Sequence, residues 1–378
     1  MISTYAAVLA VCLASLAIGQ AAVTLCGVRG WSWISPAVGL ALVCALCWAT
    51  VRLPGEGATA AIAVLIAVAA STLFLVHRGG IEGGASSDGG WALRDGLAVG
   101  LPALAAASLP FLVEGQFGIL GTSFNPDMSQ HLLAADRLAE GANSQLLHQG
   151  YPMGPHAIVV ALHGGLGIGL VQGFSGLTVA VAVLAPLTAL AAFRDQPLPF
   201  RIGGALLVGL PYMVASYFAQ GAFKETMQAL FVLAFVLSLR EATKSAAWRV
   251  LPLRFVPAAL IAVGSVYTYS FPGLIWLLGA TTIWMAVEWV LGARPTTWQP
   301  GLLAGLAFVV LVAPEIGRMV DFHSFETFDP NGPGLGNLFG QVSPFEALGI
   351  WPSGDFRLSP GDGAVPAFGY FLGAAFAS

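Results

Sequence analysis

The stretch Gly121–His163 reads GTSFNPDMSQHLLAADRLAEGANSQLLHQGYPMGPHAIVVALH and is the longest polar passage in the first half of the chain. It carries two Asp, one Glu and four His between two apolar segments. Polar groups are costly near a bilayer and usually face a cavity or water. We therefore expect any chemistry of this protein to lie around these residues.

The composition outside this stretch is that of a membrane protein. Hydrophobic residues make up 57% of the 378 residues, charged residues only 9%, and the mean hydropathy is +0.81. A soluble domain carries about a quarter charged residues, so too few charges exist here to cover a soluble surface. The net charge is −4 and no Lys/Arg-rich run is present, which argues against a nucleic-acid partner.

Apolar segments predict a polytopic bundle of about eleven or twelve spans, at about 20 residues per crossing. Because lipid cannot satisfy free backbone groups, the spans must be helices and the fold class all-α. We expect N-terminal transmembrane helices over 1–113 and a membrane core over 114–378, with polar loops 114–154 and 315–363. The final apolar segment is shorter than a span, which indicates a chain truncated at its C-terminus. The candidate spans are Tyr5–Cys26, Trp33–Val51, Ala60–Val76, Leu97–Val113, Pro155–Val171, Leu177–Phe193, Ile202–Phe218, Thr226–Leu239, Phe255–Tyr269, Pro272–Leu291 and Gly301–Val312.

Basic residues mark the cytoplasmic side of such a bundle. The linker 240–254 holds four of them, and others lie in linker 194–201 and at Arg294. If every segment crosses, this count places the polar stretch inside and the tail loop outside. A site built from both polar loops requires the two loops to lie on the same side of the membrane, so one candidate span must fail to cross. Pro155–Val171, short and Gly-rich, is the weakest, and Phe255–Tyr269 is also short.

Within the polar stretch, Asp127 is a helix N-cap candidate, with Gln130 completing a capping-box pattern. The helix would run Met128–Glu140 and stop at Gly141. It is too short and polar to span, so we expect it to lie at the interface after the fourth span. Asp127 and His131 share a face, where a carboxylate can orient an imidazole or share a proton or metal with it. The alternative is that Asp127 only caps and His131 only faces water.

The run Tyr151-Pro152-Met153-Gly154-Pro155-His156 opens the next apolar segment. Proline suits a first helical turn, so His156 would sit in that turn and point back at the loop. His163 lies seven residues on, deeper on the same face. For His163 a structural hydrogen bond is the favoured interpretation, and a cavity-lining role is the alternative.

Three histidines, His131, His148 and His156, together with Asp127 are residue types that bind divalent metals. No tight ligand spacing such as HExxH is present. We expect no protein-only metal site; a divalent cation stays open as a cofactor, but none is clearly encoded.

A second polar island, Lys224-Glu225, stands at the start of an otherwise apolar span. A Lys at the membrane edge is a functional candidate with Glu225 as its partner, and the alternative is a snorkelling helix-end Lys. Lys224 is suited to bind a phosphate as a point charge. Arg318, just beyond another apolar span, is suited to bind one bidentately.

Two runs of residues carry a resemblance to a known family: Asn125-Pro126-Asp127-Met128-x-x-His131 and, further on, Tyr151-Pro152-x-Gly154-x-His156. From about Phe111 onward, the chain resembles the polytopic membrane glycosyltransferases of the GT-C superfold, in particular the large actinobacterial-type proteins of that group. The resemblance departs in two ways, because four spans precede the loop where the family has one, and the acidic residue is a lone Asp.

The resemblance implies inverting transfer of a hexosyl or pentosyl group from a polyprenyl-phosphate donor to a cell-envelope acceptor. The reaction would occur at the non-cytoplasmic face of a bacterial plasma membrane. Asp127 would be the general base, with His131 and His156 orienting it or the acceptor. The residues assigned to substrate binding are Tyr151, Lys224, Glu225 and Arg318.

The alternatives are a transporter or flippase for a polar or lipid-linked substrate, or a structural membrane component. An enzyme would gather its polar groups at one membrane face, whereas a transporter would gather them near the midplane between inverted repeats. The sequence shows no repeat of fixed period, which favours the enzyme.

Overall fold

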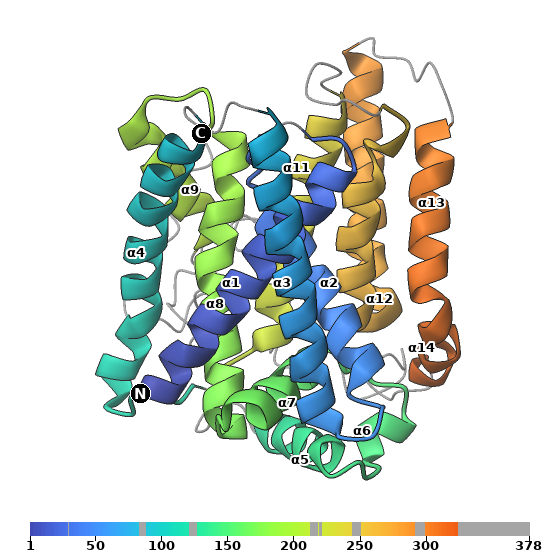
Figure 1. Cartoon of the computed structure of the whole chain (residues 1–378). Helices are drawn as coiled ribbons and strands as arrows, with labels where there is room; N and C mark the ends of the chain where they lie inside the picture. The colour runs from blue at the N-terminus through green and yellow to red at the C-terminus, as the bar shows by residue number, and fades with distance from the viewer. Residues whose placement is uncertain are drawn as a thin grey trace, which may run out of the picture.

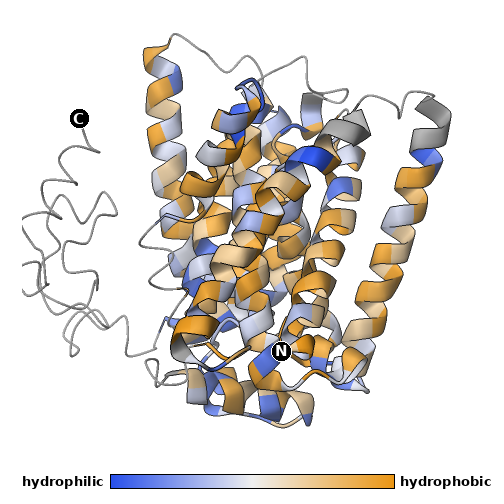
Figure 2. Cartoon of the chain, turned by 90° about the vertical axis from the view of Figure 1, so that its left-hand side faces the viewer, coloured by the Kyte–Doolittle hydropathy of each residue, from blue (hydrophilic) through white to orange (hydrophobic). Residues whose placement is uncertain are grey.

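The computed structural model describes residues 1–28, 30–82, 88–120, 127–211, 218, 221–243, 251–291 and 299–323. The regular elements of these residues are α-helices and short 3-10 helices, which confirms the all-α fold class (Figure 1). Seven helices are long and apolar enough to cross a membrane, so the chain is a multi-pass membrane protein. Figure 2 shows hydrophobic residues running along the long helices, with hydrophilic residues more frequent in the short helices at one end.

Two parts of the chain pack into one bundle. Residues of the first four helices share a continuous core with residues of the later ones, and α1 and α8 lie side by side (Figure 1). The helices are α1 (Ile2–Leu25), α2 (Ser35–Thr50), α3 (Glu56–Glu82), α4 (Asp88–Glu114), α5 (Asp127–Ala139), α6 (Gln145–His148), α7 (Gly154–Leu166), α8 (Leu170–Ala189), α9 (Leu198–Gly209), α11 (Phe223–Thr243), α12 (Val256–Val290), α13 (Gln299–Val312) and α14 (Ile316–Phe322), with 3-10 turns η1 (Leu190–Ala192), η3 (Leu251–Leu253) and η4 (Ala313–Glu315).

Small residues bring α1 and α2 unusually close. A side chain at Gly19 would collide with the carbonyl oxygen of Ser35, and one at Gly39 with that of Ser15. Close backbone approach at small residues is how membrane helices gain packing energy when lipid is as apolar as their side chains. The two helices therefore form a rigid pair against which later helices pack.

The long helix α12 is a hairpin. Ser270 adopts φ 57° and ψ −152°, which is not helical, and the chain reverses there. The rings of Phe255 and Trp284 lie 6.3 Å apart, whereas a straight helix would separate these residues by about 40 Å. Gln228 of α11 joins the arms, because it donates to the Gly273 carbonyl (3.1 Å) and accepts from Ser265 Oγ (2.7 Å). The two apolar segments expected over this region are thus the two arms.

Helix α7 lies across the lower end of the bundle in Figure 1, beside α5. Its first turn carries His156, which contacts His131 of α5. Its last turn carries Gly164, which packs against Gly57 in the first turn of α3. At about 20 Å, thirteen residues are too few for the roughly 30 Å hydrocarbon core. Both ends of α7 lie at the same end of the bundle, so the expected span Pro155–Val171 does not cross.

Because Pro155–Val171 does not cross, the two polar loops are no longer expected on opposite sides of the membrane. With α7 not crossing, the end that carries α5, α6, α7 and α14, here called the lower face, holds the described parts of both polar loops (Figure 1). The opposite end is called the upper face. By helix direction, the described basic residues divide into Arg78, Arg94, Arg194, Arg201, Arg240 and Arg254 at the upper face, and Arg52, Arg137, Lys224 and Arg318 at the lower face.

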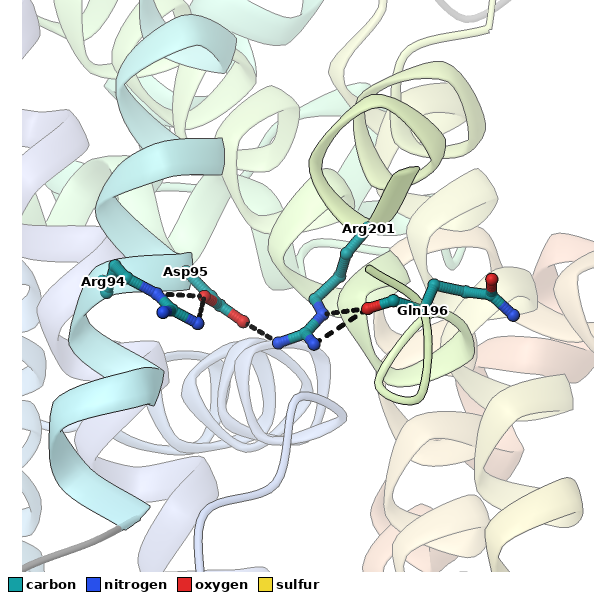
Figure 3. A network of polar contacts seen from close by, with 4 residues as sticks. All are labelled: Arg94, Asp95, Gln196 and Arg201. Carbon is teal, nitrogen blue, oxygen red and sulfur yellow. Dashed lines mark hydrogen bonds and ion pairs between the residues drawn. The ribbon is translucent and has the colours of Figure 1, made fainter. Parts of the chain in front are cut away.

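An ion-pair network ties α4 to α9 near the upper face (Figure 3). Asp95 is fully buried and pairs with Arg201 as well as with Arg94, whose Nε lies 3.0 Å from Asp95 Oδ1. Arg201 also donates from Nη2 (2.9 Å) and Nε (3.2 Å) to the Gln196 carbonyl. Each nitrogen of the partly buried Arg201 guanidinium is therefore directed at an acceptor, and the buried Asp95 carboxylate has the paired cations that a charge inside a membrane protein requires.

Candidate functional site

Two buried histidines form the centre of a polar cluster at the lower face. His131 comes from α5 and His156 from the first turn of α7, and His156 Nε2 lies 3.2 Å from His131 Nδ1. His156 is 0% and His131 6% exposed. Phe223 packs edge-on against both rings at 5.0 and 5.6 Å, and Phe174 against His156 at 5.5 Å. These aromatic walls exclude water and hold the imidazoles in one geometry.

Local sequence signals place the histidines there. Helix α5 ends at Ala139, two residues before Gly141, whose φ is +65°, and Ala142 N donates to the Arg137 carbonyl at 2.8 Å. This is the left-handed C-terminal motif that glycine permits. His131 lies on the buried side of α5 with Ala134, Ala135 and Leu138. The short helix expected from the sequence after the fourth span is thus observed, at the lower face of the bundle.

The surroundings of the histidine pair favour the neutral form of the imidazoles. Burial, with Lys224 and His156 nearby, lowers the pKa of the His131 imidazole far below its usual range. A neutral ring has one donor and one acceptor nitrogen, so a bond between the two rings fixes both tautomers. His156 Nδ1 has no hydrogen-bond partner among the described residues. An orphan acceptor is tolerated more readily than an orphan N–H, which favours His156 Nε2–H as the donor to His131.

Lys224, at the start of α11, joins the cluster through Tyr151. Its ammonium donates to the Tyr151 hydroxyl and lies 4.5 Å from the centre of the Tyr151 ring and 5.7 Å from that of Tyr269. Glu225 accepts from the Tyr269 hydroxyl at 3.4 Å. The Tyr151 ring also lies 5.6 Å from that of His131. Lys224 is therefore held by aromatic rings beside the histidine pair rather than extended into solvent.

A second set of contacts fixes the turn that carries Tyr151. Arg318 of α14 donates from Nη2 to the Tyr151 carbonyl (2.6 Å) and from Nη1 to the Leu147 carbonyl (3.1 Å). Its Nε lies 3.2 Å from Glu315 Oε2. Glu315, 4% exposed, also accepts from Trp48 Nε1 at 2.5 Å. Arg318, expected to bind substrate, is directed at the protein backbone here and positions Tyr151.

Trp48 and Arg52 were not predicted from the sequence. The guanidiniums of Arg52 and Arg318 both lie over the Trp48 ring, with their Cζ atoms 4.6 Å and 4.8 Å from the ring centre. Trp48 is 2% exposed. The one available signal was a Trp-x-x-x-Arg spacing at the lower end of α2, which by itself does not distinguish an interfacial aromatic from a structural partner.

The other predicted residues lie as follows. Asp127 begins α5, one turn before His131, and its side chain is outside the described residues. His148 is exposed on α6. His163 Nδ1 lies 2.9 Å from the Ile168 carbonyl oxygen at the end of α7, which supports its structural interpretation. The tail loop beyond His323 lies outside the described residues.

The cluster combines groups suited to proton movement and to anion binding. A neutral imidazole pair can accept a proton at one ring and pass one at the other, and an ammonium among aromatic rings can hold a phosphate or a polar ligand. Within the described residues, no three His, Cys, Asp or Glu side chains come together as metal ligands. No known protein-family model, curated protein or solved structure matches the chain.

Proposed function

We propose that this chain is a membrane glycosyltransferase that moves a sugar from a polyprenyl-phosphate donor to a cell-envelope acceptor. The observation that carries the proposal is the meeting of four predicted residues, His131, Tyr151, His156 and Lys224, at one face of the bundle. They come from α5, from the turn before α7, from α7 itself and from the distant helix α11. A glycosyl transfer needs a base for the acceptor hydroxyl and a cation for the donor phosphate, and this face offers candidates for both.

In this proposal Asp127 is the base. It stands one turn from His131 on α5, and carboxylates four residues from an imidazole share its helix face. The His131–His156 pair keeps the surroundings neutral, and Lys224 with Tyr151 meets the donor phosphate. Glu225 orients Tyr269, and Arg318 holds the Tyr151 turn in place.

The distribution of basic residues supports placing this reaction outside the cytoplasm. More described Arg and Lys residues lie at the upper face than at the lower one, and the upper linkers carry Lys244, Arg249 and Arg294 in the sequence. Positive residues favour the cytoplasmic side. The lower face is then the non-cytoplasmic side of a bacterial plasma membrane, where lipid-linked sugars and envelope acceptors meet.

A transporter or flippase for a polar or lipid-linked substrate is the second candidate, favoured by the break at Ser270 in α12. Discontinuous helices form the substrate sites of many transporters, near the midplane. Here the break lies next to Tyr269, at the level of the lower-face cluster. Polar groups gathered at one face fit an enzyme better than a midplane carrier.

The test is a turnover assay with the protein in lipid nanodiscs and a panel of polyprenyl-phosphate sugars. We expect wild type to transfer one of them, Asp127→Asn to abolish transfer, and Lys224→Met to raise KM for the donor. Asp136→Asn is the matched control, because Asp136 is an exposed residue of the same helix and its change should leave turnover intact.

Full transfer by Asp127→Asn would reduce Asp127 to a helix cap and remove the proposed mechanism. Movement of the lipid-linked sugar across the bilayer without transfer, measured with the protein reconstituted in sealed vesicles, would support the transporter instead.

A further inference from the structure

An apolar groove opens between α1, α2, α3 and α7. Its cavity volume is about 260 Å³. The back wall is buried and includes Val43, Cys47 and Ile158, which are 3%, 1% and 2% exposed. The rim is formed by exposed leucines, Leu13 and Leu65 among them. The groove is therefore a recess that opens sideways, where the membrane-crossing helices α1 and α3 would face lipid.

Helix α7 presents one side to this recess. The lining positions Ile158, Ala161, Leu162, Gly165 and Leu166 recur at the spacing of a single helix face. His156 lies two residues before Ile158 and so faces nearly the opposite way, towards α5. The groove and the histidine pair thus lie on opposite sides of the same short helix.

We propose that this groove binds one hydrocarbon chain of a membrane lipid and that the bound chain supports α7 from behind the site. The position of the recess selects the occupant. It runs about 10 Å along α3, between Ala61 and Val68. It opens between α1 and α3, which are both long and apolar enough to cross a membrane, so lipid chains are the medium at its mouth and a single hydrocarbon chain is the occupant that reaches it.

The surroundings agree with that occupant. Every lining residue is apolar, so the groove offers water few hydrogen-bonding partners and suits an apolar ligand. The groove lies on the lower half of α1 and α3, so a chain entering from the lower leaflet reaches it. This site does not depend on the proposed sugar transfer, because the donor phosphate in that proposal sits across α7.

The test uses photo-crosslinking in nanodiscs with a phosphatidylcholine that carries a diazirine on its acyl chain. We expect labelling of the buried α7 peptide that contains Ile158, in addition to the exposed rim peptides. Filling the groove with Ala10→Leu and Val64→Phe should reduce labelling of the α7 peptide severalfold. The matched control is Ala6→Leu with Val76→Phe, which places the same changes at exposed positions of α1 and α3 outside the groove.

Elution as a monodisperse peak and continued labelling of α13 would show that the filled variant is folded. A second variant, Leu162→Ala, enlarges the groove and should increase labelling of the α7 peptide. Labelling confined to the exposed rim in wild type, or equal labelling of the α7 peptide in the filled and control variants, would overturn the proposal.

Discussion

Acidification should destabilise this protein through His131, and the size of the effect can be worked out. Burial lowers the pKa of the His131 imidazole, so the folded protein holds it neutral while the unfolded chain protonates it near pH 6.5. The unfolded state then binds more protons below that pH, and stability falls as pH falls. While the imidazole stays neutral in the folded protein, the loss is 1.36 kcal/mol per pH unit. From pH 7 to pH 5 it amounts to about 2 kcal/mol.

The assay compares thermal unfolding of wild type and His131→Gln in nanodiscs at pH 7 and pH 5. The Gln variant is uncharged at both values, so its fall in Tm should be smaller than that of wild type by a few degrees. His148→Gln removes an exposed histidine of the same region and should behave as wild type. An equal pH dependence in wild type and His131→Gln would refute the claim that a buried neutral imidazole occupies this position.

Three further predictions concern stability and are tested by thermal unfolding. Asp95→Ala should destabilise by about 2–4 kcal/mol because it removes the buried carboxylate that pairs with the partly buried Arg201 guanidinium, and the double variant with Arg201→Met should recover much of that loss; additive losses would contradict the pairing. Trp48→Phe removes the donor to the buried Glu315 carboxylate and should cost about 1.5–3 kcal/mol, so an unchanged Tm would count against that bond. Ser270→Gly should stabilise by about 1 kcal/mol because the observed backbone angles suit glycine, whereas Ser270→Ala should not, and equal effects would contradict the strain.

The parts of the fold that could be predicted are those set by local chemistry. Composition identified a helical membrane protein, and the Asp127 and Gly141 signals placed α5 within a residue at each end. The residues of the polar cluster could be selected from the sequence, although their contacts could not. His156, Lys224 and Tyr151 are polar residues at the ends of apolar segments, where a polar group is costly and is usually retained for a function.

The remaining features depend on contacts between distant segments. Whether Pro155–Val171 crosses could not be decided from its length and apolar character, because α7 is placed by its contact with α3. The role of Arg318 follows from the Tyr151 carbonyl that it meets, and the reversal at Ser270 follows from the packing of two arms. No local pattern encodes these features, since each arises only when the helices assemble.

The Trp48–Glu315 bond joins residues 267 positions apart, and this separation has a consequence for biogenesis. Chains are made from the N-terminus and helices enter the bilayer in turn, so Trp48 is in place long before Glu315 is synthesised. Until α14 arrives, the Tyr151 turn lacks the two hydrogen bonds that Arg318 donates to the Tyr151 and Leu147 carbonyls. The lower-face site can therefore reach its final form only after α14 has been made, and a ribosome stalled before residue 315 would leave inserted helices with a Tyr151 turn that Arg318 does not yet hold.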